Sequence, residues 1–405
     1  MVPHALKEKI NKFQIVAQLQ QQGIYPYFRP LEMNYGTEVI IRGKKVLMFG
    51  SNSYLGLTHH PKVKEAARFA LEHYGTGCSG SRFLNGNSCL HEELEEELAE
   101  FTGKESAIVF STGYQTNLGV VATLTGRNDC ILLDEMDHAS IIEGGRLSFS
   151  NLRKYEHNNM SNLEVQLQSA KCNNVKLIVS DGVFSMEGDI VKLKDMIALA
   201  EKYHAMVMID DAHSLGVLGK YGDGTAAHFN LTDKVDLIMG TFSKSLASLG
   251  GFVAGRVDVI NYLKHHARSL IFSASIPPAA AGAALGALRV LKNESERVAQ
   301  LWENTWYMKY ALKQMGFDLG KSETPIIPIF VRNDMLTFQF ASKLLDEGIF
   351  INPVVSPAVK SDSSLIRLSL MSTHTTEQMD KAIEKIYSVA KSLGILQQEE
   401  SYVLQ

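Results

Sequence analysis

The sequence lacks the features that mark several common protein classes. Its four cysteines (Cys78, Cys89, Cys130 and Cys172) show no paired CxxC spacing, and its 13 histidines form no HExxH pattern. Neither a disulfide scaffold nor a metal site is therefore indicated, and a reducing cytoplasm is the expected compartment. The 40 basic and 44 acidic residues leave a net charge of -4. This charge gives no broad attraction to phosphate backbones, so nucleic acid is not expected as a partner.

Long apolar runs are also missing. The most apolar stretch, Ile276 to Leu291, starts with two prolines after Ile276 and contains Arg289, so it predicts a buried helix and not a membrane span. The N-terminus has no continuous apolar core of the kind that a signal peptide needs. Residues 1–20 are amphipathic, which most often means a helix packed on its own protein. Peripheral contact with the inner face of the cell membrane is the alternative.

The order of apolar patterns predicts an α/β fold. A chain of 405 residues suits two packed domains. Short apolar runs rich in β-branched residues alternate with helical patterns, which predicts a mainly parallel seven-stranded sheet covered by helices on both faces. The expected strands are Ala107–Ser111, Cys130–Asp134, Val175–Asp181, Ala205–Asp210, Leu237–Thr241, Phe252–Gly255 and Leu270–Ser273.

The pattern changes after about residue 285. Amphipathic helices that stop at Gly316 and Gly348 flank a segment, Leu365 to Met371, that alternates like a half-buried strand. This mixture of amphipathic helices and an alternating strand predicts a smaller α+β domain. The expected organisation is an N-terminal segment at 1–45, a large domain at 46–285 and a small C-terminal domain at 286–405.

Polar residues follow two of the expected strands. IDDAHSLG places Asp210 and His213 three residues apart in a turn, and GTFSKSLASLGG carries Thr241, Ser243 and Lys244 after the next strand. Ligands of open α/β sheets gather beyond the carboxyl ends of the strands. These side chains are therefore expected at one site.

Two more turns end at the same edge. STGYQTN opens a helix with Gly113 and Tyr114, and DEMDHAS places His138 after another strand. Taken singly, each of these features is better explained as a surface lysine, a helix cap, a structural histidine or an ordinary turn. Together they meet the requirements of pyridoxal 5'-phosphate (PLP), which needs a lysine imine, an acid for its ring nitrogen and a phosphate cradle.

Each residue then has an expected task. Lys244 forms the imine and serves as general acid and base, while Asp210 keeps the pyridine nitrogen protonated. His213 is expected to hydrogen-bond the 3-oxygen of the pyridine ring, and His138 to stack on the ring face opposite Lys244. The phosphate is expected to meet the amides of a helix N-terminus and two hydroxyl groups, from Gly113, Tyr114, Thr241 and Ser243.

From about Tyr25 to Gly394 the chain resembles the α-oxoamine synthase family of fold-type I, aspartate aminotransferase-like PLP enzymes. Within that family it is most similar to the soluble bacterial serine palmitoyltransferases. The resemblance rests on the blocks FGSNSYLGL (49–57), GTGCSGSRFLNG (75–86), DEMDHASIIEG (134–144), SDGVFSMEGD (180–189), IDDAHSLGVLG (209–219) and GTFSKSLASLGGFVAG (240–255).

The resemblance implies further residues and partners. Ser185 corresponds to a cofactor contact, Arg367 to the arginine that meets the substrate carboxylate, and Asn52 and Ser81 to the lining of the substrate pocket. Without the family context, Arg367 is equally well explained as a surface cation. Ser185 and Ser81 would then be turn formers, and Asn52 a helix cap. Ser273 and Ala274 match the segment that reaches the partner's phosphate site in a homodimer with active sites at the interface.

The implied reaction joins L-serine to a long-chain acyl-CoA, palmitoyl-CoA, giving 3-oxosphinganine, CoA and CO2, the first step of sphingolipid synthesis. Two alternatives stay open on the sequence. One is a sister α-oxoamine synthase, such as a glycine C-acetyltransferase or an 8-amino-7-oxononanoate synthase. The other is a PLP-dependent aldolase. A non-enzymatic binding protein on this fold is expected to have lost Lys244 or Asp210, and both are present.

Overall fold

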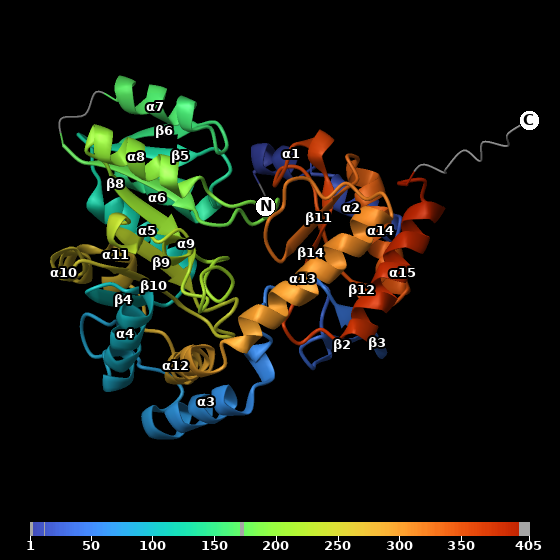
Figure 1. The fold of residues 1–405 in the computed structure, drawn as a ribbon, viewed down its shortest axis with the longest axis horizontal. Helices are drawn as coiled ribbons and strands as arrows, with labels where there is room; N and C mark the ends of the chain where they lie inside the picture. The colour runs from blue at the N-terminus through green and yellow to red at the C-terminus, as the bar shows by residue number, and fades with distance from the viewer. Residues whose placement is uncertain (1–2, 12, 171–173, 397–405) are drawn as a thin grey trace, which may run out of the picture.

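The protein, described by a computed structural model, has a large lobe built around one sheet. The structure describes residues 3–11, 13–170 and 174–396. The sheet has the strand order β4-β10-β9-β8-β7-β5-β6 (Figure 1). Its strands are β4 (Ser106–Phe110), β5 (Cys130–Asp134), β6 (Asn151–Tyr155), β7 (Lys176–Asp181), β8 (Met206–Asp210), β9 (Leu237–Thr241) and β10 (Gly251–Gly255).

Strand direction matches the expectation of a mainly parallel sheet. Neighbours from β9 to β6 pair in parallel, and β10 pairs antiparallel with both β9 and β4. The expected strand at Leu270–Ser273 is wrong, because Arg268–Ile271 forms the short helix α11. The seventh strand is β6, which sequence reasoning missed since its residues at the sheet edge are mostly polar and partly exposed.

Helices cover both faces of this sheet, as the strand pattern requires. One face packs on a core that includes residues of α5, α6, α10 and α11. The other face packs on α7 and α8 at one end and on α3, α4 and α12 at the other. The bounds are α3 (Pro61–Tyr74), α4 (Cys89–Thr102), α5 (Gly113–Leu124), α6 (Ala139–Ser148), α7 (Met160–Ser169), α8 (Leu193–Tyr203), α9 (Thr225–His228), α10 (Val257–His266) and α12 (Pro278–Asn293).

A second lobe holds two further sheets together with helices from the C-terminal part of the chain (Figure 1). One sheet has the order β11-β14-β13, and the other has the order β1-β2-β3-β12. In the second sheet, β3 pairs in parallel with β12, so an N-terminal strand joins the C-terminal part of the chain. The elements are β1 (Met33–Asn34), β2 (Glu38–Ile41), β3 (Lys44–Met48), α13 (Glu296–Gln314), β11 (Ile326–Phe330), α14 (Asp334–Asp346), β12 (Ile349–Phe350), β13 (Asn352–Val354), β14 (Leu365–Ser369) and α15 (Thr376–Ser392).

Strand β14 differs from its expected exposure. The alternating segment Leu365 to Met371 was expected to be half-buried, yet all of its residues are buried, including the five of β14. The strand lies between β11 and β13, and the polar side chains of Arg367 and Ser369 point toward each other and not toward solvent, at 2.8 Å between Nη1 and Oγ. An alternating pattern can therefore mark a buried polar face as well as a solvent face.

The N-terminal amphipathic stretch forms two helices, α1 (His4–Asn11) and α2 (Ile15–Gln21). The expectation that this stretch packs on its own protein is confirmed for α2, whose Leu19 is buried against Phe338 and Val355. No residue of α1 is buried. Among the residues that the structure describes, no helix is both long and apolar enough to cross a membrane.

Candidate active site

The carboxyl ends of five strands surround one cavity of about 270 Å³. This volume is near the lower end of the range for small-molecule sites. Nine of the residues expected from the sequence line it: Gly113, Tyr114, His138, Ser185, Asp210, His213, Thr241, Ser243 and Lys244. They come from segments more than a hundred residues apart, and the parallel sheet brings them together because its strands end at the same edge.

The carboxylate of Asp210 is held by two amide donors. Ala212 donates its backbone N–H to Oδ1 at 2.9 Å, and Asn117 donates from Nδ2 to Oδ2 at 2.7 Å. Asp210 is 3% exposed. A buried carboxylate with these donors presents a fixed negative charge at the floor of the cavity.

His138 caps the N-terminus of α6 and lines the cavity with one ring nitrogen already engaged. Its Nδ1 lies 2.7 Å from the hydroxyl of Ser140 and accepts the Ser140 backbone N–H at 3.3 Å. Burial lowers the pKa of His138, the charge of Asp210 opposes this shift, and Lys244 adds to it. The accepting Nδ1 places the ring proton on Nε2.

Lys244 and His213 line the same cavity, and in each case burial there lowers the pKa. Burial lowers the pKa of Lys244 to about 8, although Asp210 and Asp181 act in the opposite direction. Burial, reinforced by the positive charges of Lys244 and Arg367, lowers the pKa of His213 well below its ordinary value. A lysine amine that loses its proton near neutral pH can act as a nucleophile or a base.

The same cavity contains groups that can hold an anion. Helix α5 begins at Gly113, capped by Thr112, whose side chain accepts the Gln115 N–H at 3.1 Å. Thr241 Oγ1 lies 3.0 Å from Ser243 Oγ. A Cβ on Gly113 would lie 2.9 Å from Thr241 Oγ1, so a side chain there would crowd the space between the helix N-terminus and the hydroxyls. Such N-termini bind phosphate.

Arg367 and Asn52 lie one layer behind the cavity wall. Arg367 donates from Nε to the carbonyl of Ser185 at 2.5 Å and from Nη1 to Asn52 Oδ1 at 2.9 Å. Among the described residues, its Nη2 has only a long contact of 3.4 Å with Tyr54 Oη. The guanidinium is thus held in place with one nitrogen weakly engaged.

The remaining expected residues do not line the cavity. Ser273 Oγ accepts a bond from Gln115 Nε2 at 3.1 Å, and the Ala274 carbonyl accepts the Ser111 hydroxyl at 2.5 Å. The Ser81 hydroxyl is buried and has no partner among the described residues. The tasks assigned to all of the expected site residues, these three included, stay predictions.

Sequence reasoning missed three residues at the site. Asn117 and Asp181 line the cavity, and the Tyr54 hydroxyl lies 2.8 Å from His213 Nδ1. Signals for all three were available: Tyr54 and Asp181 lie inside blocks quoted for the resemblance, and Asn117 is the last residue of STGYQTN. Each is buried or faces the site from the end of a strand or the second turn of α5.

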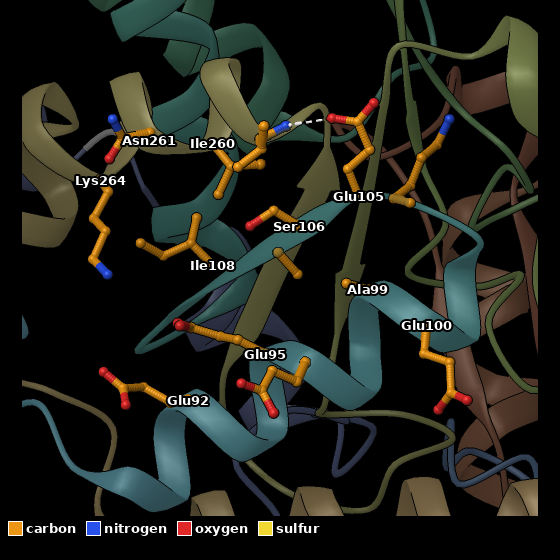
Figure 2. A pocket seen from close by; sticks show the side chains of 14 residues that line it. Glu92, Glu95, Ala99, Glu100, Glu105, Ser106, Ile108, Ile260, Asn261 and Lys264 are labelled. Carbon is orange, nitrogen blue, oxygen red and sulfur yellow. Dashed lines mark hydrogen bonds between the residues drawn. The ribbon is translucent and has the colours of Figure 1, made fainter.

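A larger cavity of about 610 Å³ lies elsewhere, between α4, β4 and α10 (Figure 2). Glu92, Glu95, Glu96, Glu100 and Glu105 line it, and none of the expected site residues does. These carboxylates would repel a phosphate group. The smaller cavity is therefore the candidate active site despite its size.

Comparison with known proteins agrees with this geometry. Residues 44–386 match the family described as aminotransferase class I and II. The chain belongs to that family. Its fold is the fold-type I arrangement, α/β with a mainly parallel seven-stranded sheet.

Relatives within the family narrow the resemblance. The chain is 59% identical to a serine palmitoyltransferase of Sphingobacterium spiritivorum, over 96% of this chain and 98% of that protein. A solved structure of SPT with PLP internal aldimine superposes with a TM-score of 0.94 at 34% identity, covering 97% of this chain and all of that one. An 8-amino-7-oxononanoate synthase of Treponema denticola is 43% identical over 94% of this chain and 97% of that protein.

Proposed function

We propose that this protein is a PLP-dependent acyltransferase that condenses L-serine with palmitoyl-CoA, giving 3-oxosphinganine, CoA and CO2. The observation that carries the proposal is 59% identity to a serine palmitoyltransferase over nearly the whole of both chains. The sister synthase is less similar, at 43%. Nothing in the site favours the aldolase alternative over the synthases.

The cavity fits PLP. Lys244, Asp210 and His213 line it together with the N-terminus of α5 and the residues Thr241 and Ser243. Lys244 would hold the aldehyde carbon, Asp210 the ring nitrogen, His213 the ring 3-oxygen and the α5 end the phosphate. The close approach of Gly113 to Thr241 supports this assignment, because a side chain at 113 would fill the cradle. When bound, PLP stabilises negative charge at the substrate Cα.

The residues of the chain then divide the work. His138 orients the bound serine from one face of the cavity, and Arg367 receives the serine carboxylate with its weakly engaged Nη2. Lys244 Nζ removes the proton from serine Cα. Its pKa of about 8 leaves part of the lysine population neutral and able to do so at physiological pH.

The bond changes balance without a further reactant. The Cα carbon attacks the thioester carbonyl of palmitoyl-CoA, and the carbon–sulfur bond breaks to release the CoA thiolate. The bond from Cα to the serine carboxyl group then breaks to release CO2, and Lys244 Nζ returns a proton to Cα. Chemistry of this kind depends mainly on orienting the bond to be broken.

Release of CoA tests the function. The purified protein is given palmitoyl-CoA with serine, glycine or alanine in parallel, while the absorption spectrum of the cofactor is recorded. Turnover with serine alone is expected. Turnover with glycine or alanine, or with a short acyl-CoA in place of palmitoyl-CoA, would move the assignment to a sister synthase. Cleavage of a β-hydroxy amino acid without CoA release would indicate the aldolase.

The proposal includes a homodimer. Large apolar side chains beside expected site segments support it: Leu84 is 76% exposed three residues after Ser81, and Phe272 is 72% exposed next to Ser273. Exposed groups of this kind mark interaction surfaces. Light scattering is expected to give twice the mass of one chain. A monomer with full activity would contradict this part of the proposal.

The proposal also includes peripheral contact with a membrane surface through residues 1–20. The exposed apolar side chains of α1, Leu6 and Ile10, support it. Flotation with vesicles of anionic phospholipid is expected to carry the full chain and not a variant lacking residues 1–11. Equal flotation of both would assign the contact to another surface.

A further inference from the structure

A partly buried histidine lies between two carboxylates next to the active site. His157 follows β6, with Nδ1 3.0 Å from Asp134 Oδ1 and Nε2 2.8 Å from Asp189 Oδ2. Burial alone would lower the pKa of His157, but the hydrogen bonds to Asp134 and Asp189 outweigh burial and raise it to about 10. The ring is therefore an imidazolium at neutral pH, donating from both nitrogens.

Asn158 also links Asp134 to Asp189. Its backbone N–H donates to Asp134 Oδ2 at 2.8 Å, and its Nδ2 donates to Asp189 Oδ2 at 2.9 Å and to the Ile190 carbonyl at 3.0 Å. The residue adopts φ +52°, a left-handed conformation that asparagine tolerates better than most residues. Residues 157 and 158 thus join the end of β5 to the loop after β7.

The turn after β5 carries His138. Asp137 accepts the N–H of Asp134 at 2.9 Å and that of Asp181 at 3.0 Å, and Asp181 Oδ2 accepts the N–H of His138 at 2.9 Å. These bonds fasten the backbone from the end of β5 to the start of α6. The position of His138 therefore depends on Asp134, which His157 holds.

The loop after β7 carries Ser185. The ring of Phe184 meets the His157 ring edge-on, with 4.4 Å between the centroids. The next residue, Ser185, accepts the Arg367 Nε bond through its carbonyl. The position of Arg367 therefore depends on a loop that His157 also holds, through Asp189 and Phe184.

We propose that His157 is a positioning residue that sets His138 and Arg367 relative to each other and thereby fixes the site for the amino-acid substrate. This inference rests on the proposed function, in which both residues orient serine. His157, Asp189 and Glu187 lie close enough together to hold a metal ion. An imidazolium that donates from both nitrogens has no lone pair for a metal, so the cluster is assigned to positioning.

The test replaces the cation with a neutral amide of similar reach, His157→Gln, and uses His228→Gln as the matched control. His228 is an exposed histidine on the short helix α9. Serine binding is titrated through the change that serine causes in the cofactor spectrum, well below the melting temperature of each variant. We expect serine affinity to fall about tenfold to hundredfold in His157→Gln, the range for a small misplacement of orienting groups. PLP content and the KM for palmitoyl-CoA are expected to stay at wild-type values.

A double variant separates positioning from stability. His157→Gln leaves both Asp134 and Asp189 without their cation, so adding Asp189→Asn removes one of two buried charges and is expected to raise the melting temperature toward the wild-type value. Serine affinity is expected to stay low in the double variant. Recovery of affinity together with stability would show a purely structural role and overturn the inference.

The two proposals fail in different ways. Wild-type protein that binds PLP but does not turn over serine and palmitoyl-CoA would contradict the proposed function. Wild-type turnover together with wild-type serine affinity in His157→Gln would overturn the positioning role alone. In both cases the His228→Gln control is expected to behave as wild type.

Discussion

Asn117 Nδ2 donates to Asp210 Oδ2 at 2.7 Å and, from the same nitrogen, to Ser140 Oγ at 2.8 Å. Ser140 is also the partner of His138 Nδ1. One amide in the first turns of α5 therefore connects the acid proposed for the cofactor nitrogen to the histidine proposed to stack on the ring. The residue proposed for the ring nitrogen and the residue proposed to stack on the ring therefore depend on a single donor.

Replacing that donor is expected to weaken cofactor binding. In Asn117→Ala, Asp210 loses a hydrogen bond inside a buried site, which costs about 1–3 kcal/mol and corresponds to roughly tenfold or more in PLP affinity. PLP release on dilution, followed by absorbance, measures the effect. Asn293→Ala, at the exposed end of α12, serves as the control. Unchanged PLP affinity would mean that the Ala212 N–H alone holds the carboxylate.

The lowered pKa of Lys244 predicts how PLP incorporation depends on pH. Only the neutral amine attacks an aldehyde, and burial lowers the pKa of this lysine to about 8. Incorporation into cofactor-free protein is therefore expected to speed up by about tenfold from about pH 7 to about pH 9 and then level off. Stopped-flow absorbance gives the rate. A rate that keeps rising in proportion to hydroxide above pH 9 would show an ordinary lysine.

The hydroxyl of Tyr54 is expected to control the proton on His213. It lies 2.8 Å from Nδ1 and receives the long contact from Arg367 Nη2. Because the pKa of His213 is well below its ordinary value, the imidazole ring is neutral. The tyrosine hydroxyl donates to Nδ1 and thereby keeps the single ring proton of His213 on Nε2. Tyr54→Phe keeps the ring packing but loses this bond, so a fall of roughly fivefold in serine affinity is expected. Tyr310→Phe, on the exposed face of α13, is expected to change nothing.

The protonation of His157 is expected to make the free energy of unfolding depend on pH. Its pKa of about 10 in the folded protein exceeds its ordinary value of 6.5, so its protonation stabilises the fold fully below pH 6.5 and this contribution is lost as pH rises through 10. The groups that face the ring are Asp134, Asp189 and Glu187. Urea unfolding should find His157→Gln least stable relative to wild type near pH 6, with the difference shrinking toward pH 10. A difference that does not vary with pH would contradict the assigned charge.

The strands that hold the site were predictable because they are apolar throughout. β5 and β9 have the predicted bounds, and β7 and β8 begin one residue later than expected. Buried parallel strands leave this pattern since both of their faces are covered. The residues at their ends were predictable from chemistry, because a lysine, an acid and a phosphate turn are all needed at once.

The errors have physical causes as well. Leu270–Ser273 is a short apolar run, and such runs do not distinguish a strand from a turn of helix. β6 was missed because a polar strand at a sheet edge lacks the apolar signal. Asn117 was not proposed because its importance comes from where α5 lies against β8, a tertiary contact that local pattern does not carry.

The single antiparallel strand has a consequence for the order of folding. Residues 106–110 of β4 pair with residues 251–255 of β10, and the proposed phosphate helix α5 follows directly after β4. During synthesis, β4 and α5 leave the ribosome long before their partner strand exists, so the cradle is completed only after β10 inserts between β4 and β9. Pairings of such long sequence separation form slowly. PLP can therefore bind only chains whose sheet is complete, and its supply is expected to raise the yield of folded protein by stabilising that last-formed state.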